Sequence, residues 1–209
     1  MATAFAYSCP EPSEPSGPPA GETEREHMRR ELEERYRQAS DLWPRDRVEI
    51  INDRIVVSPV PTWVHELVVF QLMKLLMAVV EHRGWAMSCN ISLFLGTQRD
   101  RYKPDLTVAP TNAPLWGKDH VHGDATVLVV EVVSSSSVDD DHNIKPTTYA
   151  AAGVPLCLVI DTFANTVRLL SQPNPKTERY EQHNEVPIGK TIELPDPWNL
   201  SLDTGKLTG

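Results

Sequence analysis

Apolar residues recur along the chain with two different periods, which predict alternating helices and strands. Over residues 62–84 they fall at the three- and four-residue spacing of a helix, with Thr62 able to cap its start and Gly84 its end. This run is so apolar that we expect a core helix. Residues 22–39 are rich in helix formers of mixed charge and carry only a thin apolar stripe. We expect an exposed helix there, docked on the domain or on a second subunit.

Runs of β-branched and aliphatic residues predict the strands. Residues 47–59 form two such runs around Asn52 and Asp53, which favour a turn, so we expect a hairpin. The run at 125–134 has the length and composition of a central strand. Further strands are predicted at 85–95, 103–110, 155–162 and 166–172, with short edge strands broken by prolines after residue 179.

The order of these elements predicts the fold class. Residues 111–124 look like a linker, and 136–153 are expected to be largely helical. Helix, hairpin, helix, strands, helix and strands in succession indicate an α/β or α+β domain with a mixed sheet and helices on at least one face. We expect one such domain over residues 25–209.

Composition sets the first 24 residues apart from that domain. They hold five prolines and no Lys or Arg, which predicts a disordered tail rather than a secretory signal. No stretch contains the roughly 18 uninterrupted apolar residues of a membrane span, so we expect a soluble, cytoplasmic protein without a membrane partner. Cys89 and Cys157 lie in apolar runs and are predicted to be buried free thiols. The net charge of −9 works against non-specific binding to nucleic acid, so any such function must depend on a local site.

Two acids stand in or beside very apolar strands. Asp105 follows Pro104 where one strand begins, and Glu131 interrupts the valine-rich run at 127–133. An isolated acid in such a strand costs free energy unless it is paired or binds a metal. If the two strands are neighbours, the carboxylates can converge and suit a hard divalent ion such as Mg²⁺. The alternative is a buried acid held by an arginine or a backbone amide.

A third polar group follows the Glu131 strand. Asp141, Lys145 and Tyr149 recur every four residues and therefore share one face of the predicted helix. A short connection folds that helix back over the strand, so Lys145 could reach the two carboxylates. Such a trio could also be a plain ion pair. Pro146 disfavours a helical conformation at Lys145, so the helix either starts at Pro146 or is kinked there.

These segments together resemble the Uma2-type restriction endonucleases of the PD-(D/E)xK nuclease superfamily, which are common in bacteria. The resemblance runs from about residue 47 to 203 through "SPVPTWVHE", "KPDLTV", "VLVVEVVSSSS", "DHNIKPTTYAAAGVP" and "LVID". It implies a restriction-endonuclease-like core, a mixed sheet flanked by helices with extra hairpins. The wider superfamily places a lysine two residues after the glutamate. Here that residue is Val133, and Lys145 matches the position to which this family moved the lysine.

The resemblance also implies an activity and assigns roles to residues. Asp105, Glu131 and the Val132 carbonyl would hold Mg²⁺ or Mn²⁺, which activates water for hydrolysis of DNA phosphodiesters. Lys145 would orient that water and stabilise charge in the transition state. His65, Glu49, Asp141 and Tyr149 are supporting candidates, and a homodimer is expected.

A non-catalytic member of the same fold, acting as a dimeric binding or scaffold protein, is the alternative. The acidic net charge and Pro146 favour it.

Overall fold

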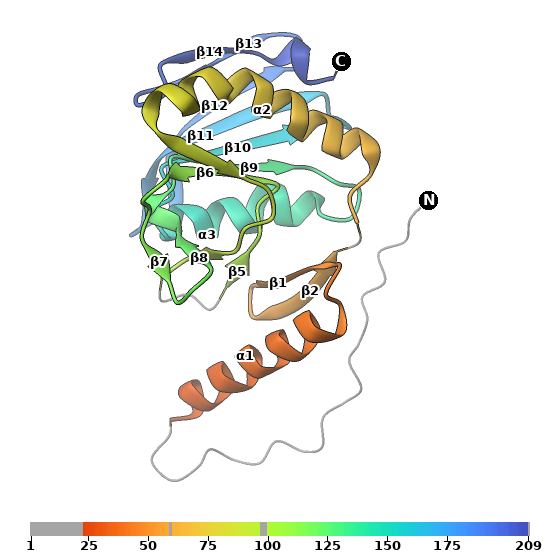
Figure 1. Ribbon diagram of the computed structural model, residues 1–209, viewed down its shortest axis with the longest axis vertical. Coiled ribbons are helices and arrows are strands. Elements are labelled where there is room, and N and C mark those ends of the chain that lie inside the picture. The colour runs from red at the N-terminus through yellow and green to blue at the C-terminus, as the bar shows by residue number, and fades with distance from the viewer. Residues whose placement is uncertain (1–22, 59, 97–99, 209) are drawn as a thin grey trace.

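The computed structural model describes residues 23–58, 60–96 and 100–208 (Figure 1). The disordered tail predicted for residues 1–24 lies outside them, apart from Thr23 and Glu24. These two residues begin helix α1 (Glu24–Leu42), where Thr23 and Glu26 form a capping box. The helix forms as predicted and extends slightly beyond the expected range.

A mixed six-stranded sheet forms the centre of the protein. Its strand order is β12-β11-β10-β9-β6-β3, and only β9 and β10 run parallel. The strands are β3 (Trp85–Ser88), β6 (Leu106–Pro110), β9 (Leu128–Val132), β10 (Leu156–Asp161), β11 (Thr166–Asn174) and β12 (Arg179–Pro187). The predicted fold class, a mixed sheet flanked by helices, is confirmed.

Helices cover both faces of this sheet (Figure 1). On one face, helix α2 (Trp63–Arg83) and the small hairpin of β13 (Thr191–Leu194) and β14 (Leu200–Asp203) pack on alternate strand residues such as Val130 and Leu158. On the other face lies the helical segment 138–151, a π-helical turn (Asp140–Ile144) followed by α3 (Lys145–Ala151). It packs on the intervening residues, including Val129 and Val159. This alternation follows from the two-residue period of a strand.

A second, smaller sheet lies beside the first. Its order is β2-β1-β5-β4-β8-β7. The predicted hairpin is present in it, because Asn52 and Asp53 both adopt positive φ and form a tight turn. Helix α1 packs on this hairpin through Tyr36 and Ala39. The strands are β1 (Arg47–Ile51), β2 (Arg54–Ser58), β4 (Leu93–Phe94), β5 (Arg101–Tyr102), β7 (Leu115–Trp116) and β8 (His120–His122).

Several predicted elements differ from those observed. The single strand expected at 85–95 is two strands in different sheets, because β3 pairs with β6 whereas β4 pairs with β5 and β8. Asn90, at positive φ, turns the chain between them. The expected linker 111–124 contains β7, β8 and a 3₁₀ turn (Gly123–Ala125). After residue 179 the first strand is not short: β12 continues for nine residues as the sheet edge and ends at Pro187.

Burial differs from expectation at three places. Cys89 is exposed, whereas Cys157 is buried as predicted. Trp63, the first residue of helix α2, is 81% exposed, although a core helix is expected there. Helix α2 buries only its inner face, and its outer face exposes Val64, Phe70 and Met77 as well.

Helix α2 is also, among the described residues, the one helix long and apolar enough to cross a membrane by length and composition. Core helices of soluble proteins meet the same criterion, and the inner face of α2 packs on the sheet.

Truncating a buried side chain of the central strand β10 should destabilise the protein strongly. Leu158 is 0% exposed and belongs to the core between the sheet and α2, so Leu158→Ala should lower the free energy of unfolding by about 2–5 kcal/mol. Leu115→Ala, in the strand β7, where the leucine is 52% exposed, should change it by less than about 1 kcal/mol. Urea denaturation of both variants measures this difference, and equal losses would contradict the described core.

Candidate active site

Two neighbouring antiparallel strands place the two predicted acids opposite each other. Leu106 pairs with Val130 between β6 and β9, and extending this register by one position brings Asp105 across from Glu131. Residues opposite each other on neighbouring strands point to the same face of the sheet. Both side chains therefore lie on the face that the helical segment 138–151 covers, and both are buried.

Glu131 has its partners on that helical segment. The Lys145 Nζ donates to Glu131 Oε2 at 2.9 Å, and the Tyr149 hydroxyl donates to Oε1. Lys145 is only 1% exposed, and its Nζ also lies 2.9 Å from Asp141 Oδ1. The expected four-residue face of Asp141, Lys145 and Tyr149 is thus the face turned toward the strand.

Asp105 is held by three groups from other parts of the chain. Its Oδ1 accepts a hydrogen bond from Arg47 Nη1 at 2.5 Å. Its Oδ2 lies 3.1 Å from His65 Nε2 and accepts from the Val132 backbone N–H at 2.7 Å. Val132 therefore contacts Asp105 through its N–H, and a role for its carbonyl as a metal ligand stays a prediction. The arginine and backbone amide considered as an alternative for a buried acid are both present here.

Glu49 and Arg47 join the site through the hairpin strand β1. Glu49 is buried, accepts from the Lys103 backbone N–H at 2.8 Å and lies 3.5 Å from Arg47 Nε. Sequence reasoning identified Glu49 but missed Arg47. The signal was present, because residues two apart on a strand share a face, and a basic residue two positions before a candidate acid is placed to pair with it.

The serine run after β9 holds Asp141. The Ser137 hydroxyl donates to Asp141 Oδ2, and the Ser137 carbonyl accepts from the Asp141 backbone N–H at 2.8 Å. Ser137 in turn contacts Ser134 through its hydroxyl. These bonds fix the start of the helical segment, so Asp141 supports Lys145 from a defined position.

The α-helix α3 starts at Lys145, one residue before Pro146, and so lies close to the first of the two expected alternatives. The residues before it are also helical, so the segment is helical over residues 138–151, and Lys145 keeps ordinary α-helical dihedral angles next to the proline. A π-helical turn precedes the proline and takes up the irregularity. Val133, where the wider superfamily has its lysine, is buried in the apolar cluster that includes Tyr149.

The two carboxylates have opposite pKa shifts. Burial would raise the pKa of Asp105, but the hydrogen bond from His65 and the charge of Arg47 hold it well below its usual range. Burial raises the pKa of Glu131 to about 8, because the carboxylates of Asp141 and Asp105 add to the effect and Lys145 offsets only part of it. One acid of the pair therefore ionises much more readily than the other.

The basic partners stay charged. Burial lowers the pKa of Lys145, but the neighbouring carboxylates, Glu131 first, outweigh it and raise that pKa well above its ordinary value. Burial also disfavours the charged form of His65, yet its hydrogen bond to Asp105 raises the pKa of the imidazole overall. The charge of Arg47 and the hydrogen bond from His65 together hold the Asp105 carboxylate.

The donor set suits a hard divalent cation. Four acidic side chains (Glu49, Asp105, Glu131, Asp141) meet two permanent cations (Arg47, Lys145) and His65. Burial, together with the carboxylates of Asp141 and Asp105, raises the pKa of Glu131, and a bound cation would favour its ionised form. Among the described residues, however, no three His, Cys, Asp or Glu side chains are arranged to hold a metal. Two carboxylates can thus act as ligands, and water or backbone oxygens must complete the coordination.

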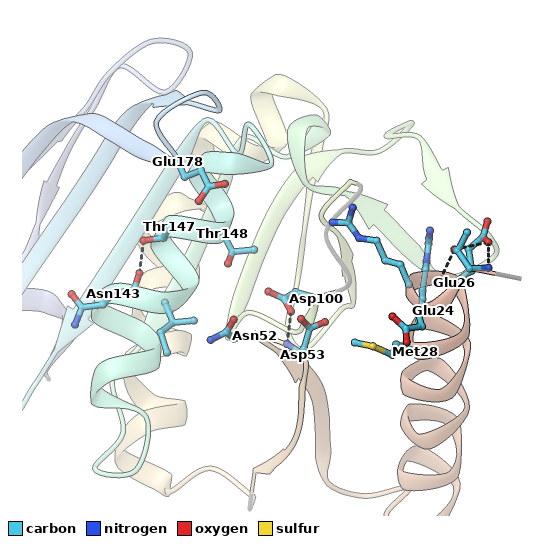
Figure 2. Close-up of a pocket in the computed structure, with 14 residues that line it drawn as sticks. Glu24, Glu26, Met28, Asn52, Asp53, Asp100, Asn143, Thr147, Thr148 and Glu178 are labelled. Carbon is cyan, nitrogen blue, oxygen red and sulfur yellow. Dashed lines mark hydrogen bonds between the residues drawn. The ribbon is translucent and has the colours of Figure 1, made fainter. Parts of the chain in front are cut away.

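A large groove lies on the other side of the same helical segment (Figure 2). Its volume is about 1380 Å³, and Thr147, Thr148 and Asp100 are among its lining residues. It has more acids than bases, namely Glu24, Glu26, Asp53, Asp100 and Glu178 against Arg25 and Arg29. The acid pair is not part of its lining, and its excess of negative charge is unfavourable for a nucleic acid.

Comparisons with known proteins agree with this architecture. The family described as "Uma2: Putative restriction endonuclease" matches residues 33–204. Among solved structures, the chain is similar to "a putative nuclease belonging to DUF820 from Anabaena variabilis ATCC 29413", with a TM-score of 0.62 and 16% identity. That match covers 77% of this chain and 89% of the other, and at this identity it shows the fold alone. No curated protein matches the chain. Because the family match spans most of its length, the chain belongs to the Uma2 family of restriction-endonuclease-like proteins.

Proposed function

We propose that this protein is a Mg²⁺- or Mn²⁺-dependent endonuclease that hydrolyses phosphodiester bonds of DNA. The observation that carries the proposal is the buried pair of Asp105 and Glu131 on facing strand positions, with Lys145 2.9 Å from Glu131. Family membership supports a nuclease, and the metal and DNA belong to the proposal.

In this proposal Asp105 and Glu131 hold the metal ion. When bound, the ion lowers the pKa of a coordinated water and polarises the phosphoryl oxygen. Lys145 donates to Glu131 and Asp141, and an ammonium has three N–H groups. The third N–H can orient the attacking water or stabilise charge on a phosphoryl oxygen. Tyr149 keeps the Glu131 carboxylate in place through its hydroxyl.

Arg47 and His65 are the groups of the cluster that reach solvent. Their side chains are 16% and 11% exposed, whereas Lys145 is enclosed. They contact both oxygens of Asp105, so a metal ion bound there would compete with them for the lone pairs of this carboxylate. The freed guanidinium of Arg47 is suited to bind a phosphate of the approaching strand.

We further propose that residues 25–209 form one cytoplasmic domain that assembles as a homodimer. Helix α2 supports the dimer, because its outer face exposes Trp63, Phe70 and Met77 in one stripe at helical spacing. An exposed apolar stripe of this kind is typical of a protein–protein interface.

A non-catalytic binding or scaffold protein is the second candidate. It is favoured by the protein donors that occupy each oxygen of Asp105 and Glu131, and by the net charge of −9. In that case the same cluster only stabilises the fold, and no divalent ion is needed.

Cleavage assays separate the two candidates. With Mg²⁺ or Mn²⁺, the wild-type protein should cut single-stranded, duplex or branched DNA. Asp105→Asn, Glu131→Gln and Lys145→Met should each reduce the rate by at least about 100-fold, because each removes a charge that the transition state needs. Asp119→Asn, at an exposed loop position, is the matched control and should keep the activity. A folded wild-type protein that cuts none of these substrates would contradict the nuclease proposal and favour the non-catalytic alternative.

The metal-free protein should become less stable as pH rises from about 5 to 8. Over this window native Glu131, with its pKa of about 8, keeps a proton that the unfolded chain, with a pKa of about 4.3, has released. The free energy of unfolding should fall by roughly a few kcal/mol, and Glu131→Gln should make this fall smaller, leaving the part due to the raised pKa of His65. The depressed pKa of Asp105 contributes stability that is fully present above about pH 4 and is lost only on acidification below this window.

Urea denaturation in EDTA at several pH values measures this profile. The exposed Glu185→Gln on β12 is the control and should retain the wild-type slope. A wild-type profile as flat as that of Glu131→Gln would show that Glu131 is ionised throughout.

The dimer should depend on the outer face of α2. Phe70→Asp places a charge in the exposed stripe and should convert the dimer to monomer, whereas Phe163→Asp, at a turn where the phenylalanine is also exposed, should not. Size-exclusion chromatography with light scattering gives the mass of each variant. A monomeric wild-type protein, or a Phe70→Asp variant that stays dimeric, would rule out this interface.

A further inference from the structure

The helical segment that carries Lys145 contains an irregular turn that the proposed chemistry does not explain. Over Asp140–Ile144 it is π-helical, and the Lys145 backbone N–H bonds the Asp140 carbonyl five residues earlier. Such wide turns are rare and are usually found at functional sites. Inserting one residue rotates the following side chains by about 100° relative to the preceding turn. The turn therefore sets the direction in which Lys145 and Tyr149 point.

Pro146 explains why the His142 carbonyl in this turn needs a hydrogen-bond donor from outside the helix. In a regular helix the N–H of residue 146 would bond the carbonyl of His142, four residues before it, but proline has no N–H. That carbonyl is satisfied from another element. Arg168, on β11, donates from Nη2 to the His142 carbonyl at 2.6 Å. The guanidinium thus takes the place of the missing backbone donor.

A second contact also holds His142, and it comes from β10, the strand that forms a hairpin with β11. The His142 Nε2 lies 2.8 Å from Asp161 Oδ2 at the end of β10. Asp161 Oδ1 accepts the backbone N–H groups of Phe163 and Ala164, each at 2.8 Å, so this carboxylate is itself fixed by the turn. The side chain and the carbonyl of His142 are therefore both anchored to the β10–β11 hairpin.

The strand register links this anchor to the acid pair. Glu131 pairs with Val159 between β9 and β10, and Val159 pairs with Arg168 between β10 and β11. The three residues form one row across the sheet, so their side chains point to the same face. The helical segment lies over this row. At one end it contacts Glu131 through Lys145, and two strands away it contacts Arg168 through His142.

We propose that Arg168 is a positioning residue for Lys145. Its guanidinium replaces the N–H that Pro146 lacks, fixes the wide turn and so keeps the Lys145 ammonium directed at Glu131. The catalytic consequence rests on the proposed nuclease function, but the positioning itself does not. Arg168 touches neither carboxylate of the acid pair and acts only through the helix.

Nuclear magnetic resonance of the Lys145 side chain tests the positioning without any cleavage assay. A buried, ion-paired ammonium gives a distinct ¹H–¹⁵N signal, which is assigned by its loss in Lys145→Met. Arg168→Met keeps the length of the side chain and removes its donors, so the Lys145 signal should shift or disappear. Arg168→Lys, which retains a donor, should preserve it, and so should the control Arg179→Met on the edge strand β12. An unchanged Lys145 signal in Arg168→Met overturns the proposal.

A double-mutant cycle with Pro146→Ala tests the substitution of donors. Alanine restores an N–H at position 146 that can bond the His142 carbonyl. Arg168→Met should raise the unfolding equilibrium constant about tenfold or more in the wild-type background, and about threefold or less with Ala at 146. If the double variant, Arg168→Met with Pro146→Ala, is no more stable than Arg168→Met alone, the proposal is overturned. If Arg168→Met alone does not fold, the proposal is overturned when the double variant does not fold either. Because both readouts are independent of DNA cleavage, a failed nuclease assay leaves this inference intact.

Discussion

A carboxylate without solvent exposure in the middle of a sheet must find its partners inside the protein, and Glu131 imposes that condition here. The partners are Lys145 and Tyr149, one helical turn apart, so a helix has to cross this face of the sheet at one position and in one orientation. Removing either partner would leave charge or hydrogen-bonding capacity unsatisfied in the interior. The helical layer that covers the strand is therefore held in place by these two polar contacts as much as by apolar packing.

Asp105 connects the hairpin strand β1 and helix α2 to the part of the sheet that carries Glu131. Its partners Arg47 and His65 come from the hairpin strand β1 and from the first turn of α2, on segments far apart in the chain. The candidate site thus lies where hairpin, helix and sheet meet. Two acids close together with opposite pKa shifts are an arrangement that enzymes use to separate an ionised role from a protonated one. The same charges, left without a metal, would serve only to hold these segments together.

The parts of the site that obey a local period could be predicted from the sequence. The four-residue face of Lys145 follows from helical geometry, and the meeting of the acid pair follows from two consecutive strong strands that pair. Arg47 could not be assigned to Asp105, because its contact spans 58 residues and depends on how the hairpin folds back. The turn at Asn90 was missed because the apolar run continues on both sides of it, while pairing sends its halves to different sheets. The helix through Pro146 depends on a distant guanidinium, which local propensity cannot reveal.

Val133, two residues after Glu131, has a consequence for how such sites can change over evolutionary time. Where carboxylate and lysine share a strand, each substitution in that strand alters the chemistry and the packing together. Here Val133 only fills the interior, and the cation is supplied by the overlying helix. Substitutions in the strand can therefore improve core packing without moving the amine, and substitutions in the helix can change the position and direction of the Lys145 amine separately. Core packing and the supply of the cation thus belong to different segments, and each segment can change in sequence without loss of the other's role.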